Sequence, residues 1–191
     1  NNSDMPIINS KILREKIKDN SIRIVDVRRE QDYQLGHITN AVNLPLAKLL
    51  ADDSVESIQK IAQDFGISDE TSVVIYDDTF GALSSRVVWA LQYIGHKDAK
   101  LLDVTFSQWK TLGYEISTEV PEIESATHSI KENKEIMATA EYLEKVKENK
   151  NVIIIDNRER LNYLEQHIPG AINIPYRTLA TDGKILRTKE G

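Results

Sequence analysis

Two short charged segments of this chain repeat at a fixed spacing. Asp26 and Arg28 stand two residues apart, and Asp156 and Arg158 repeat the pair 130 residues later (156 − 26 = 130). A carboxylate and a guanidinium at this spacing can form a bidentate pair. Such a pair can take part in catalysis or can order the loop that carries it. We expect the loop-ordering role for both copies.

The charged pairs belong to a longer pattern that recurs in the same register. The first copy continues with Tyr33, His37, Ala41, Asn43 and Pro45, and the second with Tyr163, His167, Ala171, Asn173 and Pro175. Chance rarely keeps a register through so many positions. The pattern therefore indicates a duplicated domain.

A third candidate site is the loop that starts at Asp77. It follows an apolar strand over 72–76 and leads into a helix over 84–94. Ligands of open parallel sheets bind beyond the carboxyl ends of the strands, where loop and helix N–H groups can hold an anion and lower the pKa of a thiol. Arg86 could bind an anion there or be an ordinary residue of the first helical turn. Asp77 and Asp78 are weak evidence for a metal, and we expect none.

The elements that must position these residues alternate along the chain. Apolar strands are predicted at 22–27, 72–76 and 99–103, and helices at 10–20, 44–50, 54–65, 84–94 and 106–112. Strands that are apolar on both faces and alternate with helices predict an α/β fold, in which helices flank both faces of a parallel sheet.

The repeat also suggests how the chain divides into domains. Residues 1–120 are predicted to form the first domain, the polar stretch 121–135 a linker, and residues 136–191 the beginning of a second domain. Within this second part, a helix over 139–149 and a strand over 152–156 repeat the start of the first domain.

Composition narrows the function classes. The 191 residues include no cysteine, so they can form neither a disulfide framework nor a thiolate nucleophile. The formal net charge of −6 and the absence of a basic run argue against nucleic acid. No apolar run is long enough to span a membrane, and no signal peptide is visible. We expect a cytoplasmic monomer without a cofactor.

These motifs resemble the rhodanese (thiosulfate sulfurtransferase) family. The resemblance rests on both Asp-x-Arg … His-Ile-x-x-Ala-x-Asn-x-Pro segments, the strand 73–76 with its loop, and the stretch from Leu101 through Trp109 to Gly113. The segment 167–175 is its most specific part. The layout is similar to tandem members, whose N-terminal domain is silent and whose C-terminal domain carries a cysteine. The histidines at 37 and 167 then belong to a structural turn, although a ligand or base role stays open.

The resemblance implies that the first domain is inactive. Active members carry a cysteine directly after the Tyr-ending strand, where this chain has Asp77. The repeat places the corresponding residue of the second domain near position 207 (77 + 130 = 207). We therefore expect a second domain that is truncated at Gly191 and a nucleophile that lies beyond it.

The implied activity is sulfur transfer of the thiosulfate or 3-mercaptopyruvate class through a cysteine persulfide. Its partners would be a small anionic sulfur donor and a thiophilic acceptor such as cyanide or a thiol. Arg158 and Arg160 lie just past the carboxyl end of a predicted strand and are the candidates for binding the donor. Asn162 stands where several thiosulfate-using members have a donor-binding arginine, and Arg160 could substitute for it. One alternative is a non-catalytic rhodanese-like module for binding or regulation. Another is a phosphatase, but the chain offers no Cys-x₅-Arg loop.

Overall fold

A five-stranded parallel sheet forms the centre of the molecule. The computed structural model describes residues 6–133 and, further along, four short strands at 154–156, 171–173, 180–181 and 184–185. The spatial order of the central sheet is β1-β6-β5-β2-β4, and every neighbouring pair is parallel. Its strands are β1 (Ile7–Ile8), β2 (Ile22–Asp26), β4 (Val42–Asn43), β5 (Ser72–Tyr76) and β6 (Ala99–Leu102).

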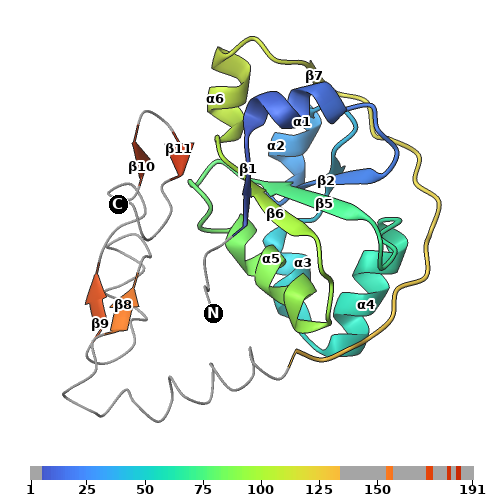
Figure 1. Cartoon of the computed structure of the whole chain (residues 1–191). Helices are drawn as coiled ribbons and strands as arrows, with labels where there is room; N and C mark the ends of the chain where they lie inside the picture. The colour runs from blue at the N-terminus through green and yellow to red at the C-terminus, as the bar shows by residue number, and fades with distance from the viewer. Residues whose placement is uncertain (1–5, 134–153, 157–170, 174–179, 182–183, 186–191) are drawn as a thin grey trace.

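Helices cover both faces of this sheet, which confirms the expected α/β fold (Figure 1). The side chains of β5 show why, because they alternate between two cores. Val73 and Ile75 face one core, and Val74 and Tyr76 face the other. The first core includes residues of α3 (Leu46–Ala51), α4 (Val55–Asp64) and α5 (Ser84–Tyr93), and the second includes residues of α1 (Ser10–Lys16), α2 (Glu30–Leu35) and α6 (Phe106–Thr111).

Some predicted boundaries are wrong. The first helix ends at Lys16 rather than near residue 20, and its N-cap is Asn9, whose side chain accepts from the Lys11 N–H. The helix stops there because Asp19 accepts from the N–H and hydroxyl of Ser21, which turns the chain into β2. The helix expected at 44–50 starts at Leu46, two residues later, since the preceding residues continue alongside β2.

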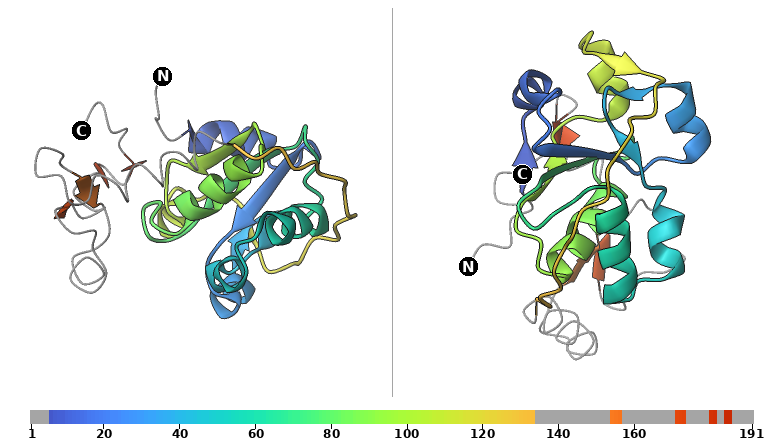
Figure 2. Two further views of the ribbon diagram at one scale, coloured as in Figure 1. Left: turned by 90° about the horizontal axis from the view of Figure 1, so that it is seen from below. Right: turned by 90° about the vertical axis from the view of Figure 1, so that its right-hand side faces the viewer.

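The segment after α6 is tied to the rest of the molecule. It first forms β7 (Ile116–Ser117), which pairs antiparallel with β3 (His37–Ile38). We call residues 118–133, which follow, the strap. The strap crosses the ends of α4 and α5, where the N–H groups of Ala126 and Lys131 donate to the carbonyls of Gln63 and Ile94 at 2.9 and 2.8 Å (Figure 2). Most of the predicted linker thus packs on the sheet domain, while the division into domains stays a prediction.

Glycines allow this close packing. Gly66 and Gly95 end α4 and α5 with φ of +68° and +95°, values that favour glycine. A Cβ on Gly66 would lie 2.8 Å from the carbonyl oxygen of Glu124, and a Cβ on Gly95 would collide with the carbonyl oxygen of Lys131. The strap backbone therefore occupies the space where these two side chains would begin.

The sequence repeat recurs as a repeat of backbone pairing. Val25 and Asp26 of β2 pair with Val42 and Asn43 of β4. The strands β8 (Ile154–Asp156) and β9 (Ala171–Asn173) are also parallel and pair Ile155 with Ile172 and Asp156 with Asn173. All four residues of the second pairing lie 130 positions after those of the first. The expected helix over 139–149 lies outside the described residues, as do His167, Arg158 and Arg160.

In the part of the chain that the structure describes, no helix combines the length and hydropathy that crossing a bilayer requires.

Candidate functional site

The topology brings together the carboxyl ends of β2 and β5. The two strands are neighbours in the sheet, and Asp26 pairs with Tyr76 at their ends. β2 leads into α2 on one face, whereas β5 leads into α5 on the opposite face (Figure 1). Diverging connections of this kind mark the ligand-binding position of open α/β sheets.

The loop after β5 forms a cradle around the Asp77 carboxylate. Its Oδ1 accepts from the N–H groups of Thr79 and Gly81 at 2.9 and 3.1 Å. Its Oδ2 accepts from the N–H groups of Leu83 and Ser84 at 3.1 and 2.8 Å, and from the Ser84 hydroxyl at 2.9 Å. The side chain is buried, since Asp77 is 3% exposed. Four backbone donors and one hydroxyl thus point at one carboxylate.

Backbone conformation and helix polarity make this cradle a site for an anion. Phe80 and Gly81 have φ of +55° and +92°, and such left-handed residues turn successive N–H groups toward a common centre. The N-terminus of α5 adds its unpaired N–H groups at Ser84. The site is therefore built for a negative charge, and Asp77 supplies that charge from within the chain.

A second network joins β2, β5 and α2. Arg28 Nη2 donates to Asp26 Oδ2 at 2.7 Å and to the carbonyl of Gly36 at 2.7 Å. The Tyr76 hydroxyl donates to the same Asp26 Oδ2 at 2.6 Å and accepts from the N–H of Ile38. These contacts fix the start of the loop after β2 and the turn after α2. They agree with a loop-ordering role for Asp26 and Arg28, which stays a prediction.

The charges in this network shift the pKa of its members. Burial opposes the charge on Arg28, but the Asp26 carboxylate outweighs this effect and raises the arginine pKa. Burial and the same carboxylate raise the pKa of Tyr76 well above its usual value and the pKa of Tyr33 to about 12. Both tyrosines therefore stay neutral at physiological pH and act as hydrogen-bond donors.

The remaining predicted residues lie in varied places. Asp78 is exposed and accepts from the N–H and hydroxyl of Ser107 in the first turn of α6. Arg86 is exposed in the first turn of α5, which leaves both of its possible roles open. His37 is buried in β3, and its ring contacts the carbonyl oxygens of Tyr33 and Glu119. Asp156 belongs to β8.

The sequence interpretation missed the contributions of Tyr76 and Phe106. The sequence pattern places this tyrosine in an apolar strand and gives no role to its hydroxyl, which joins Asp26 to β3. Phe106 starts α6, and its ring packs 3.8 Å from the Arg28 guanidinium carbon. A Tyr at the last position of an apolar strand, next to the acidic end of another strand, is the signal that could have revealed the first contact.

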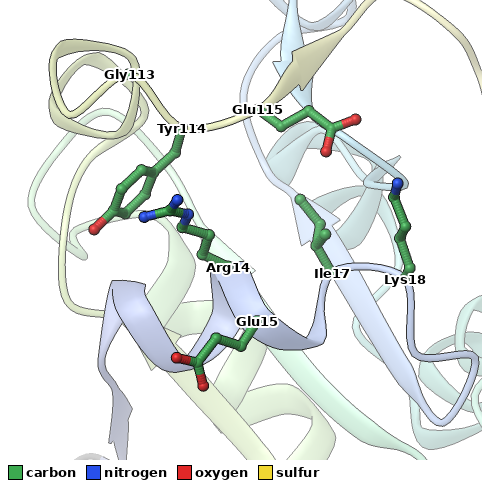
Figure 3. Close-up of a pocket in the computed structure, with 7 residues that line it drawn as sticks. All are labelled: Arg14, Glu15, Ile17, Lys18, Gly113, Tyr114 and Glu115. Carbon is green, nitrogen blue, oxygen red and sulfur yellow. The ribbon is translucent and has the colours of Figure 1, made fainter.

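A surface pocket of about 450 Å³ lies elsewhere, between the end of α1 and the residues after α6 (Figure 3). Arg14 places its guanidinium carbon 4.8 Å from the centre of the Tyr114 ring, and Glu15, Lys18 and Glu115 also line the pocket. Because α1 leads directly into β2, its end lies near the amino end of that strand. This pocket is thus separate from the cradle.

Comparison with known proteins relates the whole arrangement to one family. The profile described as "Rhodanese-like domain" matches residues 9–112 and 139–190. The chain is 26% identical over 214 residues to "Sulfur carrier protein TtuD" of Thermus thermophilus, covering 96% of this chain and 74% of that protein. It is 29% identical over 128 residues to "Thiosulfate sulfurtransferase" of Gallus gallus, covering 61% of this chain and 44% of that protein.

A solved structure shares the fold. The crystal structure of SseA from Escherichia coli, titled as a 3-mercaptopyruvate sulfotransferase with the "Rhodanese" fold, matches with a TM-score of 0.76 at 20% identity. The match covers 95% of this chain and 79% of that one. The chain thus spans about three quarters of some relatives and less than half of others.

Proposed function

Because this chain belongs to the rhodanese-like domain family, we propose that it is part of a sulfurtransferase and that its described domain is the catalytically silent half. The donor class would be thiosulfate or 3-mercaptopyruvate, and the acceptor cyanide or a thiol. Relatives named as a thiosulfate sulfurtransferase and a sulfur carrier protein support sulfur transfer in general. The persulfide route, the donor and the acceptor are our extension of that support.

The proposed reaction has two nucleophilic steps. A cysteine thiolate attacks the outer sulfur of thiosulfate, the S–S bond of the donor breaks, and sulfite leaves with the electron pair. Cyanide then attacks the outer sulfur of the enzyme persulfide, which yields thiocyanate and regenerates the thiolate. In this scheme the protein positions the donor and stabilises the persulfide anion with fixed N–H groups.

The observation that carries the proposal is the cradle after β5. Four N–H groups and a hydroxyl surround the Asp77 carboxylate at 2.8–3.1 Å. The carboxylate oxygens stand two bonds from Cβ, as the outer sulfur of a cysteine persulfide would. Hydrogen-bond donors that would stabilise such an anion are therefore present, whereas the nucleophile is not. A carboxylate cannot carry sulfane sulfur, so we assign no sulfur transfer to this cradle.

The second copy of the repeat would then provide the active site. By the 130-residue spacing, its nucleophile would be a cysteine near position 207, and Arg158 and Arg160 would bind the anionic donor. The matched backbone registers of β2 with β4 and of β8 with β9 support a second copy of the same unit.

The proposal can be tested on the natural protein. Intact mass and thiol alkylation should show a chain heavier than 21.7 kDa that carries a reactive cysteine. Thiocyanate formation from thiosulfate or 3-mercaptopyruvate should require that cysteine. A natural protein without a thiol would contradict the proposal.

A non-catalytic module for binding or regulation is the second candidate. Asp77 favours this candidate as well, because its carboxylate fills the cradle and leaves no room there for an anionic substrate. The thiol measurement distinguishes the two: a reactive cysteine favours the enzyme, and its absence favours the binding module.

A further inference from the structure

Three histidines fasten the strap to the sheet domain. His37 in β3 contacts the carbonyl of Glu119 at the start of the strap. His96, just after α5, contacts His128 in the middle of the strap. All three rings are buried, with 0%, 4% and 1% exposure. The network around Asp26 and the cradle around Asp77 involve none of them, so their role is a separate question.

The contacts of His96 and His128 need more protons than two neutral rings hold. His96 Nε2 lies 2.8 Å from the carbonyl oxygen of Thr71, and His128 Nδ1 lies 2.6 Å from the carbonyl oxygen of Ser129. A carbonyl oxygen can only accept, so each of these nitrogens must carry a proton. The remaining nitrogens, His96 Nδ1 and His128 Nε2, face each other at 2.8 Å and need a proton between them. The pair therefore requires three protons, one more than two neutral imidazoles supply.

The same count applies to His37. Its Nδ1 lies 2.9 Å from the carbonyl oxygen of Tyr33, and its Nε2 lies 2.7 Å from the carbonyl oxygen of Glu119. Both partners can only accept, so both contacts are hydrogen bonds only when both ring nitrogens carry a proton. The Tyr33 ring stacks on it with centroids 3.8 Å apart and planes 8° apart, a geometry that suits a cation on an aromatic face.

Charged neighbours surround the pair unevenly. The Asp69 carboxylate lies 3.5 Å from His128 Nδ1 and also accepts from the N–H and hydroxyl of Ser129. On the other side, Asp98 faces His96 but pairs with Lys100. Burial lowers the pKa of His96, and a positive charge on His128 lowers it further. The carboxylate that lies nearest the pair is therefore on the side of His128.

Charged groups near His37 come from the end of β2, the loop after it and the strap. The Arg28 guanidinium donates to the carbonyl of Gly36, the residue before His37, and is itself paired with Asp26. The Glu119 residue that supplies the carbonyl is exposed. The His37 ring is thus contacted mainly by two backbone carbonyls and the Tyr33 ring.

We infer that the strap is a proton-dependent clasp, which means that its attachment to the sheet domain depends on the protonation of the three histidines. The strap is attached when these rings together carry two protons more than three neutral rings carry. It loosens when those two protons leave. When the His96–His128 pair loses its extra proton, one of two contacts fails. Either the lone pairs of His96 Nδ1 and His128 Nε2 face each other, or the carbonyl of Thr71 or Ser129 has no ring N–H to accept from. Loss of the second proton from His37 leaves a lone pair facing a carbonyl oxygen. Each loss replaces an attractive contact in a buried place with a repulsive one.

The expected direction with pH follows from these contacts. The attached strap holds protons that the detached strap does not need, so the clasp should be closed near about pH 6 and loosen as the pH rises toward about 8.5. The strap leads toward the second copy of the repeated motif in the sequence.

The test is hydrogen exchange of the 191-residue chain between pH 6 and pH 8.5. Protection factors, which correct for the intrinsic effect of pH, are compared for the strap amides of Ala126 and Lys131 and for the β5 amide of Ile75. Each loss removes a hydrogen bond from a charged donor, so strap protection should fall at least about tenfold while Ile75 stays protected. Equal strap protection at both pH values would overturn the inference.

The protonation of the histidine rings can also be measured directly in the unmodified chain. Nitrogen NMR of the histidine rings in the unmodified chain at pH 6 should show both nitrogens of His37 protonated and three protons on the His96–His128 pair. Neutral rings throughout would refute the clasp. His37→Gln should reduce the pH dependence of protection near Glu119.

Discussion

Replacing Asp77 with asparagine tests the cradle, because the two side chains have the same shape but different hydrogen-bonding groups. The Asp77 carboxylate offers acceptors to five donors. An amide keeps one oxygen and puts an NH₂ group in place of the other. Its best orientation points the oxygen at Leu83 and Ser84 and leaves the NH₂ facing the N–H groups of Thr79 and Gly81 at hydrogen-bond distance.

The magnitude follows from that orientation. Two hydrogen bonds to a charged acceptor are lost, each worth about 1.5–3 kcal/mol, and two donors face a third donor in a buried site. Partial opening of the loop recovers some of this cost. We therefore expect Asp77→Asn to lower the free energy of unfolding by about 3 kcal/mol, a loss that a domain with about 5–15 kcal/mol of stability can survive.

Chemical denaturation of the 191-residue chain measures this loss, with Asp78→Asn as the matched control. Asp78 is the neighbouring residue and also accepts two hydrogen bonds, but it is exposed. Its substitution should change the free energy of unfolding by about 0.5 kcal/mol or less. If Asp77→Asn and Asp78→Asn were equally mild, the carboxylate would not be held as a buried anion and the reasoning would fail.

Three further predictions concern the strap and the β2–β5 network. Gly95→Ala should destabilise the chain by at least about 2 kcal/mol more than Gly113→Ala. Both positions have positive φ, but a Cβ on Gly95 would meet the strap backbone, whereas nothing lies within 4 Å of a Cβ on Gly113. Thermal melts of the two variants measure the difference. Tyr76→Phe should cost about 1–3 kcal/mol in urea unfolding, since its hydroxyl is a buried donor to Asp26. Burial lowers the pKa of His96, so the unfolded chain binds a proton at this ring more readily than the folded chain does. The contribution of His96 to stability should therefore decline as the pH falls from about 7 to about 5. In denaturation curves measured over this pH range, His96→Gln should make that decline smaller.

The parts of the fold that sequence reasoning predicted are those with strong local patterns. The strands β2 and β5 are short β-branched runs, and α5 shows Val87, Val88, Leu91 and Ile94 at helical spacing. The loop position of Asp77 follows directly from the end of β5. These features depend on neighbours in the sequence, so a pattern reveals them.

The features that were missed depend on contacts between distant residues. The helix α2 spans six residues and is largely polar, so no period is visible in it. The strap looks like a linker because its attachment uses backbone hydrogen bonds and two glycines that end α4 and α5. His96 and His128 are 32 residues apart, and no local pattern indicates that their rings meet.

The most direct test of the central claim is to restore a sulfur nucleophile to the cradle. The chain contains no cysteine, so Asp77→Cys introduces its sole thiol, and Asp78→Cys provides a control thiol one residue outside the cradle. After incubation with thiosulfate, intact mass should show the gain of one sulfur atom on the Asp77→Cys chain, and cyanide should remove it as thiocyanate. The Asp78→Cys chain and the unmodified chain should gain none. A thiol at position 77 that can be alkylated but gains no more sulfur than the control would contradict the claim that this loop is a sulfurtransferase cradle filled by a carboxylate.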